Sequence, residues 1–463
     1  MKEDLYRIEK DSMGEVKVLA NCLYGAQTKR AIDNFTISDL RIPNSLLKAL
    51  ALVKECCALA NKEVGALDED LATAIVKAAN EVKAGKHDRE FPIDLYQTGS
   101  GTSWNMNINE VIANIANQSF GSTLGSKSPI HPNDHVNRSQ SSNDVIPTAM
   151  NIATRLEANN LVAALSDFVS TLKSKEQEFE GLYKLGRTHL QDAVPMKISQ
   201  EFSAWRSQIE HSIKRITNCY DSLNELAIGG TAIGSGLNTV AGFKEAVIAF
   251  IKEKTGVDFV LAQNNFEAIS SRDSMLEIMG ALNSLAVSLI KISNDIRLLS
   301  SGPRCGFGEL ILPSLQPGSS IMPGKVNPVI CEMVLQVGAT VMGLHTSVSV
   351  GCQNGPLQLN IMMPLIAHNV LFAISILTNA VKSFDKKAIA AIKVDRQLCQ
   401  EKIEYSLSIV TPLALKVGYD KAAAIAHYAY KNKIKIYDAV LALTDLTPSE
   451  VSQILSINNM VRE

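Results

Sequence analysis

The sequence has little net charge, few aromatic residues and no paired cysteines, and each shortage excludes a class of protein. The formal net charge is −2 over 463 residues, and 5% of the residues are aromatic. A balanced charge offers no basic surface for nucleic acid or for an anionic membrane. The eight cysteines are scattered and none forms a C-x-x-C pair, which disfavours disulfide frameworks, cysteine-held zinc and iron–sulfur clusters. We therefore expect free, mostly buried thiols.

Targeting and membrane-spanning signals are missing as well. The first 14 residues, MKEDLYRIEKDSMG, carry charge from the second residue onward. They lack the apolar stretch of a secretory signal and the Arg/Ser-rich, acid-poor character of a transit peptide. No window approaches twenty unbroken apolar residues, so we expect no membrane span. The expected compartment is the cytosol.

Proline is absent from long stretches, and this absence predicts long helices. None occurs between Pro147 and Pro195 or between Pro195 and Pro303, and an interior proline would cost a helix roughly 3 kcal/mol. An apolar stripe with alternating spacings of four and three predicts one helix that must be surrounded, because residues beside the stripe are apolar too. The stripe consists of Ile278, Leu282, Leu285, Leu289, Ile292, Ile296 and Leu299. Further helices are expected over 147–178, 196–227, the stretch after Pro328 and 365–385, and together they predict a central antiparallel bundle.

Four polar loops interrupt the helices and hold most of the residues suited to chemistry. Asn, Ser, Thr and His dominate them, and these side chains hydrogen-bond well without carrying much charge. A bundle can bring such loops together at helix ends, within one chain or across subunits. The loops are TGSGTSWNMN (98–107), HPNDHVNRSQSSND (131–144), GRTHLQDAVP (186–195) and GSSIMPGKVNP (318–328).

The glycines of these loops do not form a nucleotide-binding motif. In GSSIMPGKV, five residues separate Gly318 from Gly324, one too many for a phosphate loop, and Val326 stands where a magnesium-binding Ser or Thr belongs. GSGTSW and GSGLNT lack the third glycine of a dinucleotide fingerprint, and no parallel-sheet pattern surrounds them. Both nucleotide functions are therefore set aside.

The end of the last loop favours an anion. Asn327 and Pro328 are typical of a helix start, whose free N–H groups attract negative charge. Lys325 adds a full positive charge just before it. From the residues alone, a flexible surface loop before a capped helix explains the pattern equally well. Ser319 and Ser320 fit turn chemistry better than catalysis unless neighbouring groups stabilise an alkoxide.

His189 in GRTHLQD is the candidate for proton transfer, because histidine titrates near neutral pH. A glycine and a proline bracket its short loop, and Thr188 and Gln191 offer polar partners. Glu332, about one helical turn past Pro328, is an acidic group that could orient the imidazole. The sequence does not tell whether the two residues meet in space.

Five blocks of the sequence occur in a recognisable order: QTGSGTSWNMNINEV, HPNDHVNRSQSSNDVIPTAM, GRTHLQDAVP, GGTAIGSGLNT and GSSIMPGKVNP. The last resembles the signature of the fumarase/aspartase superfamily, G-S-S-x-M-P-x-K-x-N. The five together resemble class II fumarate hydratases, and the resemblance runs from EKDSMG near residue 10 to GYDKAAAIA near residue 425.

This resemblance implies an all-α, mainly helical protein of three domains, 1–140, 141–395 and 396–463. Long central helices would form a twenty-helix core in a homotetramer, and loops from three subunits would build each active site. The partners implied are small dicarboxylates, with no metal and no organic cofactor. With the balanced charge and the N-terminal pattern, we expect a cytoplasmic enzyme that binds neither nucleic acid nor membrane.

Carried over to matching positions, the resemblance implies three catalytic residues. Ser319 would take a proton from C3 of malate, and the lysine, asparagine and N–H groups of its loop would hold the resulting enediolate. His189 would handle the proton on the departing or entering water, with Glu332 behind it. The residues implied to bind and position the substrate are Ser100, Gly101, Thr102, Ser141, Ser142, Asn143, Thr188, Ser320, Lys325, Val326 and Asn327.

The implied activity is the reversible hydration of fumarate to L-malate, a step of the tricarboxylic acid cycle. The alternative within the superfamily is an aspartate ammonia-lyase, in which the leaving group is ammonia. Aspartases tend to carry glutamine at the position of His189 and STND where this chain has SSND (141–144), so both positions favour a fumarate hydratase. A third hypothesis, an inactive helical scaffold, is disfavoured because the catalytic set is complete.

Two positions depart from the family pattern. Trp104 replaces a small or polar residue in the GSGT block. A second dicarboxylate site is implied at HPND, often with basic residues just upstream, but here Ser128 and Pro129 precede it. A second site and a structural role therefore both stay open for His131, Pro132, Asn133 and Asp134.

Overall fold

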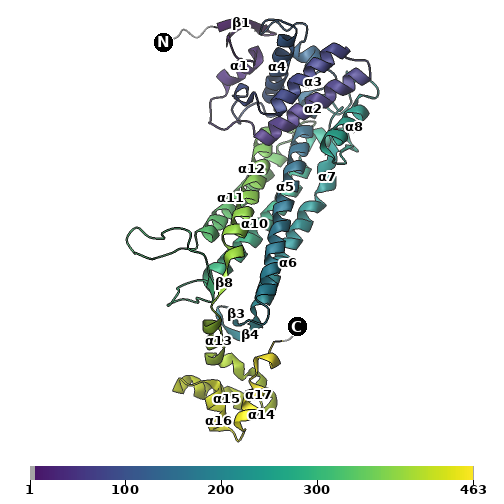
Figure 1. Ribbon diagram of the computed structural model, residues 1–463. Coiled ribbons are helices and arrows are strands. Elements are labelled where there is room, and N and C mark those ends of the chain that lie inside the picture. Colours follow the sequence, from purple (N-terminus) through teal and green to yellow (C-terminus); the bar gives the residue numbers. More distant parts are fainter. Residues whose placement is uncertain (1–5, 462–463) are drawn as a thin grey trace. The chain divides into compact units, whose positions relative to one another are not determined.

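The computed structural model describes residues 6–461 and is mainly helical, as predicted (Figure 1). Its internal contacts divide the chain into two compact units. The first unit comprises the described part of Met1–Val162, Lys214–Ala286 and Ala339–Thr378; the second comprises Ala163–Ile213, Val287–Gly338 and the described part of Asn379–Glu463. The three-domain division at residues 140/141 and 395/396 stays a prediction.

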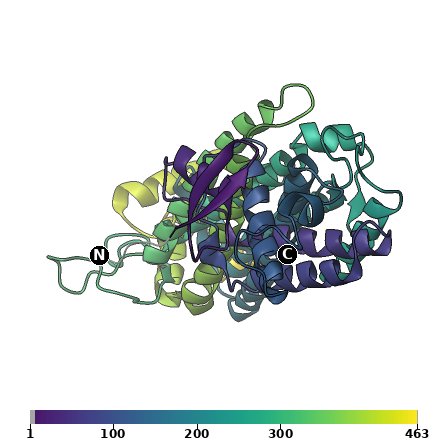
Figure 2. The same cartoon turned by 90° about the horizontal axis from the view of Figure 1, so that it is seen from above.

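The first unit contains a hairpin, a group of packed helices and the loops between them. Its elements are β1 (Tyr6–Asp11), β2 (Gly14–Leu19), α1 (Ala26–Asn34), α2 (Asn44–Glu63), α3 (Glu69–Lys83), η1 (Asp88–Glu90), α4 (Thr102–Ser119), η2 (Pro132–Val136), α7 (Tyr220–Asn224), β5 (Glu225–Leu226), α8 (Phe243–Thr255), β6 (Val260–Leu261) and α9 (Asn265–Ser270). β1 and β2 pair antiparallel, drawn as purple arrows in Figure 2, and β5 and β6 pair parallel. α2 packs against α3 and α8, and α3 packs against α4.

Five long helices contribute turns to both units: α5 (Ser142–Glu178), α6 (Ile198–Asn218), α10 (Asp273–Leu299), α11 (Val329–Gln353) and α12 (Met363–Lys387). All seven residues of the predicted apolar stripe lie on α10 and are buried. The expected helix over 147–178 begins five residues earlier, with Pro147 inside α5. The expected helix over 196–227 is two helices, because α6 ends at Asn218 and α7 follows it.

Three segments are long and apolar enough to cross a membrane by length and composition alone: Asp273–Leu299, Val329–Gln353 and Met363–Ala391. They meet this criterion although polar residues interrupt each of them. Large apolar side chains on these helices lie at the surface of the single chain, among them Val287, Met342, Val350 and Phe372. The absence of a membrane span stays a prediction.

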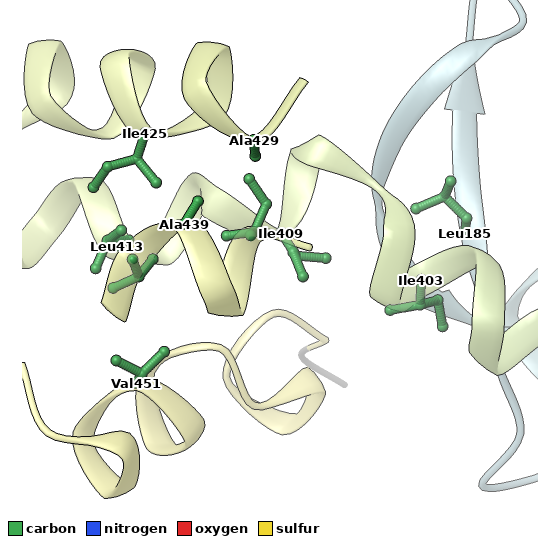
Figure 3. Packing of buried hydrophobic residues seen from close by; sticks show 10 residues of the cluster. Leu185, Ile403, Ile409, Leu413, Ile425, Ala429, Ala439 and Val451 are labelled. Atoms are coloured by element: carbon green, nitrogen blue, oxygen red, sulfur yellow. The ribbon is translucent and has the colours of Figure 1, made fainter. Parts of the chain in front are cut away.

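The second unit ends in a small helical cluster that packs against a hairpin. Its further elements are β3 (Tyr183–Thr188), β4 (Gln191–Lys197), β7 (Leu310–Ile311), η3 (Ile389–Ala391), β8 (Lys393–Val394), α13 (Arg396–Tyr405), η4 (Leu407–Leu413), α14 (Ala414–Val417), α15 (Tyr419–Asn432), α16 (Ile436–Leu443), α17 (Pro448–Ile454) and η5 (Ile457–Asn459). β3 pairs antiparallel with β4, and β7 with β8. Leu185 of β3 and Ile403 of α13 belong to the same buried cluster as Ile425 and Val451 (Figure 3). Apolar packing therefore attaches the hairpin to the C-terminal helices.

The β3–β4 hairpin corrects one expectation. Residues 186–195 were expected to be a short loop between helices, but strands cover most of this range. The strands are short and their register shifts between Leu185 and Arg187, so their residues show no sustained alternation of polar and apolar side chains. The expected loop is therefore only the two-residue turn at His189 and Leu190.

A buried carboxylate holds the start of α1. Glu110 on α4 is 4% exposed and accepts hydrogen bonds from the backbone N–H groups of Gly25, Gln27 and Thr28 and from the Thr28 hydroxyl. A Cβ on Gly25 would lie 2.6 Å from Oε2 of Glu9 and 3.0 Å from Glu110, so a larger residue would displace these carboxylates. One acidic side chain thus satisfies donors that a helix start would otherwise leave unpaired.

We predict that Glu110→Gln destabilises the protein by about 1–3 kcal/mol, because the amide nitrogen cannot accept from these buried donors. The free energy of unfolding in urea measures the effect. Glu63→Gln, at an exposed position on α2, is the matched control and should change stability by less than about 0.5 kcal/mol. Equal unfolding curves for both variants would contradict the assigned role.

Candidate active site

The loop from Pro317 to Pro328 is closed at its base by one backbone and one side-chain hydrogen bond. The N–H of Gly318 donates to the carbonyl oxygen of Lys325 at 2.7 Å, and Nδ2 of Asn327 donates to the carbonyl oxygen of Gly318 at 2.7 Å. A Cβ at position 318 would lie 2.7 Å from the Lys325 oxygen and 2.8 Å from the Asn327 nitrogen. Glycine is therefore required there. Helix α11 begins at Val329, within three residues of the predicted start at 326–328.

The hydroxyl of Ser319 forms a serine turn with the backbone two and three residues ahead. Its Oγ accepts from the backbone N–H groups of Ile321 at 3.2 Å and Met322 at 3.0 Å. Such donors stabilise negative charge on oxygen, which is what a serine alkoxide needs. The sequence alone could not show this arrangement, because it depends on the turn that the loop adopts.

Ser319 and Lys325 line the same open cavity of about 440 Å³. Lys325 is exposed, and within residues 6–461 it makes no ion pair with a carboxylate. Its charge is therefore available to an anion that enters the cavity. The remaining lining residues are Ser314, Leu315, Gln316, Pro317, Met322, Pro323, Gly324 and Val326.

His189 lies at the tip of the β3–β4 hairpin. His189 has φ of 54° and Leu190 has φ of 60°, and positive φ at both central residues is typical of a type I′ hairpin turn. Glycine and asparagine are the usual residues there, so a histidine followed by a leucine stores backbone strain of about 1–3 kcal/mol each. Thr188 and His189 are exposed. The turn presents the imidazole to solvent in a fixed backbone setting.

A buried ion pair fixes the hairpin two residues before the histidine. The guanidinium of Arg187 donates to both carboxylate oxygens of Glu309, with Nη1 3.1 Å from Oε2, and Glu309 is 1% exposed. The same guanidinium lies 4.3 Å from the centre of the Phe307 ring. Lys402 of α13 donates to the Phe307 carbonyl oxygen and lies 3.5 Å from Glu309. Arg187 and Glu309 were not predicted from the sequence, because their pairing joins residues 122 positions apart.

In the first unit, the GSGT block forms the start of α4. Gly101 has φ of 72°, and the hydroxyls of Ser100 and Thr102 are 2.8 Å apart. A Cβ on Gly99 would lie 1.8 Å from the carbonyl oxygen of Ile361, so the backbone passes very close at this point. The free N–H groups of an 18-residue helix therefore lie beside two of the predicted carboxylate-binding hydroxyls.

The SSND block forms the start of α5 and is held by Asp144. One oxygen of this buried carboxylate accepts from the N–H of Ser141 at 2.8 Å, and the other accepts from those of Gly229 and Thr231. Burial raises the pKa of Asp144 to about 6. Nδ2 of Asn143 donates to the carbonyl oxygen of Ala232 at 2.8 Å. Asp144 was not singled out from the sequence, although it ends the SSND motif.

The HPND block is built around a helix cap. Nδ1 of His131 accepts from the backbone N–H groups of Asn133 at 3.2 Å and Asp134 at 3.3 Å, and Pro132 is buried. Burial lowers the pKa of His131, which favours the neutral ring that this cap requires. Asn133 and Asp134 are exposed and line a cavity of about 490 Å³ that Ser141 also lines. The proposed second site and the SSND block thus share one cavity.

The structure groups the predicted residues by unit. Ser319, Ser320, Lys325, Val326, Asn327, Thr188, His189 and Glu332 belong to the second unit, and Ser100, Gly101, Thr102, residues 131–134 and residues 141–143 belong to the first. Within residues 6–461, no hydrogen bond joins His189 to Glu332, and no group of three His, Cys, Asp or Glu side chains could hold a metal ion. Trp104 is buried inside the first unit, so it fills the core there.

Comparison with known proteins places the chain in a family. Residues 14–343 match the family model described as Lyase, and residues 409–462 match that of the fumarase C C-terminus. The chain is 47% identical over 456 residues to fumarate hydratase class II of Methylorubrum extorquens, covering 98% of this chain and 97% of that protein. It is 46% identical over 462 residues to the mitochondrial fumarate hydratase of Homo sapiens, covering 99% and 90%. The crystal structure of class II fumarase from Schistosoma mansoni superposes with a TM-score of 0.95 at 39% identity, covering 98% and 99% of the two chains. The chain therefore belongs to the class II fumarate hydratases of the fumarase/aspartase superfamily.

Proposed function

We propose that this protein catalyses the reversible hydration of fumarate to L-malate, the reaction named in its relatives and a step of the tricarboxylic acid cycle. One observation supports the chemistry most directly: the Ser319 hydroxyl accepts two backbone N–H bonds in a cavity that also holds the unpaired charge of Lys325. The reaction needs a base that can approach a dianion and a donor set that stabilises it afterwards.

In the proposed mechanism, the Ser319 alkoxide takes the proton from C3 of malate. The electron pair moves into the neighbouring carboxylate and gives an enediolate. Lys325 stabilises its added charge, together with the backbone N–H groups of the loop and the second amide hydrogen of Asn327, whose first bonds Gly318. His189 then delivers a proton to the departing hydroxide, with Thr188 beside it and Glu332 as the acidic group that orients it.

The remaining predicted residues would bind the substrate carboxylates through neutral donors. Neutral hydroxyl, amide and backbone N–H groups discriminate a dicarboxylate by geometry, since they would not capture any anion that approaches. The residues proposed for this role are Ser100, Gly101, Thr102, Ser141, Ser142, Asn143, Ser320 and Val326. His131, Pro132, Asn133 and Asp134 are assigned to capping and loop structure rather than to a second site, because the His131 ring already caps η2.

We propose that the active form is a homotetramer in which three subunits build each site. Two features support this assembly: the exposed apolar side chains on α10, α11 and α12, and the division of the predicted site residues between the two units. Tetramer formation would bury those apolar faces in a twenty-helix core. We further propose a cytoplasmic location, which fits eight unpaired cysteines, five of them buried. No metal, organic cofactor, nucleic acid or membrane takes part in this proposal.

Ser319→Ala should lower kcat for malate by about 10²–10⁴-fold, because it removes the proposed base. Fumarate formation is followed by its ultraviolet absorbance. The control is Ser170→Ala, at an exposed position on α5, which should leave turnover unchanged. Malate turnover that survives Ser319→Ala would remove this serine from the mechanism.

Arg187→Met should lower kcat/KM on the order of 10²-fold, because the turn that carries His189 loses the anchor that positions it. It should also lower the free energy of unfolding by roughly 3 kcal/mol, because Glu309 loses its two-pronged partner and keeps only the longer contacts to Lys402 at 3.5 Å and Lys184 at 3.8 Å. Kinetics are measured well below the melting temperature of the variant. Arg206→Met is the control, since Arg206 pairs with Glu176 and Glu210 on partly exposed helix faces. Wild-type kcat/KM in Arg187→Met would contradict the anchoring role.

Malate and aspartate supplied side by side distinguish a fumarate hydratase from an ammonia-lyase. Purified protein dialysed against a chelator should convert malate to fumarate at an undiminished rate, and it should release no ammonia from aspartate. Ammonia release without malate turnover would select the ammonia-lyase. A rate that falls on dialysis and returns with a divalent cation would overturn the cofactor-free mechanism.

A further inference from the structure

A lysine without exposed surface lies beneath the loop that joins the HPND and SSND blocks. Lys54 is on α2 and is 0% exposed. Its Nζ donates to Oδ1 of Asn137 at 3.0 Å and to Oε1 of Gln140 at 2.9 Å. Both of these partners are neutral amide oxygens. Within residues 6–461, Lys54 forms no ion pair. A buried cation without a carboxylate partner is costly, and such a residue needs a reason.

Asn137 is the centre of the network that Lys54 enters. Its Oδ1 also accepts from Nδ2 of Asn105 and from Nδ2 of Asn109, each at 3.1 Å, and both donors are on α4. Its own Nδ2 donates to the carbonyl oxygen of Gln140 at 3.2 Å. Three donors from two helices thus converge on one oxygen of the residue that follows η2 as its C-cap.

The network continues to the predicted substrate-binding residues. Nδ2 of Asn105 donates to Oγ of Ser142 at 3.0 Å, and residues 137–141 of the loop line the cavity of about 490 Å³. Asn61, two turns after Lys54 on α2, donates to the carbonyl oxygen of Arg138 and accepts from the hydroxyl of Ser139. Helix α2 therefore holds the wall of this cavity at two points, Lys54 and Asn61. Of the two residues, Lys54 is closer to the SSND block in the hydrogen-bond network.

The chemistry of the site explains why an amine is kept there. Burial lowers the pKa of Lys54 to about 7, against the opposing influence of Cys57 and Asp144. Both the protonated and the neutral amine retain hydrogens for the two amide oxygens. An apolar side chain of similar length would fill the same volume at less cost, but it would leave Gln140 Oε1 without the lysine donor and Asn137 Oδ1 with two donors in place of three.

We propose that Lys54 is a positioning residue for dicarboxylate binding, which holds Asn137 and Gln140 so that residues 141–143 keep the geometry needed to bind a substrate carboxylate. This inference depends on the proposed function, because residues 141–143 bind a carboxylate only there. Lys54 itself touches no substrate. Its effect is therefore expected on substrate affinity, with little effect on the proton transfers at Ser319 and His189.

The test compares Lys54→Met, Lys54→Gln and Lys48→Met, the last at an exposed position on the same helix. Lys54→Met should raise KM for malate on the order of tenfold and change kcat by less than about twofold, which is the pattern of lost uniform binding. Lys54→Gln should recover part of the affinity, because its amide group still donates. Lys48→Met should have wild-type constants. Hydrogen exchange should show faster exchange at residues 137–143 in Lys54→Met than in Lys48→Met.

Asn137→Ala supplies the coupling measurement. If Lys54 acts through Asn137, the KM of the double variant should resemble that of the more impaired single variant, and the two effects should not multiply. Multiplying effects, an unchanged KM in Lys54→Met, or unchanged exchange at residues 137–143 would each overturn the proposal. Wild-type protein that does not turn over malate would overturn the proposed function instead, and the exchange comparison would then still decide whether Lys54 holds the loop.

Discussion

A polar loop is held in one conformation only when buried groups accept hydrogen bonds from its donors. The candidate site depends on this constraint. Within residues 6–461, Glu110, Asp144 and Glu309 are three of the carboxylates that accept such hydrogen bonds. Glu110 binds the backbone at the start of α1, Asp144 binds Ser141 and the 229–231 turn, and Glu309 binds Arg187, two residues before His189. Each is almost fully buried, so water does not compete for its oxygens. Loops rich in Ser, Asn and Gly become rigid by this means without a large apolar core of their own.

The two kinds of anchor differ in what they hold. Asp144 and Glu110 accept backbone N–H groups, so they fix the course of the chain and leave side chains free for a ligand. Glu309 accepts a guanidinium, and its effect on His189 passes through β3, which carries Arg187 and ends next to His189. The loop from Pro317 to Pro328 is held by neither kind of buried carboxylate. Gly318, the Asn327 amide and the Lys325 carbonyl close it from within, and this leaves its lysine charge unpaired.

The sequence predicted those features that depend on neighbours along the chain. The stripe on α10 and the helix start after Pro328 follow from local spacing and local chemistry. The hairpin at His189 was missed, because its strands are short and irregular. Asp144, Arg187, Glu309 and Lys54 were missed for another reason. Their functions depend on partners up to 122 positions away, and a charged residue in a sequence gives no sign of whether it faces water or the core.

The left-handed turn at His189 and Leu190 has a consequence for the timing of free-energy changes. Both residues occupy a conformation that histidine and leucine seldom adopt. The cost of this backbone strain is therefore met during folding. No further ordering of that backbone is then required at the moment a ligand arrives. In a flexible turn, part of the binding free energy would be used to order the backbone. Here that free energy can stabilise the transition state and the intermediate instead.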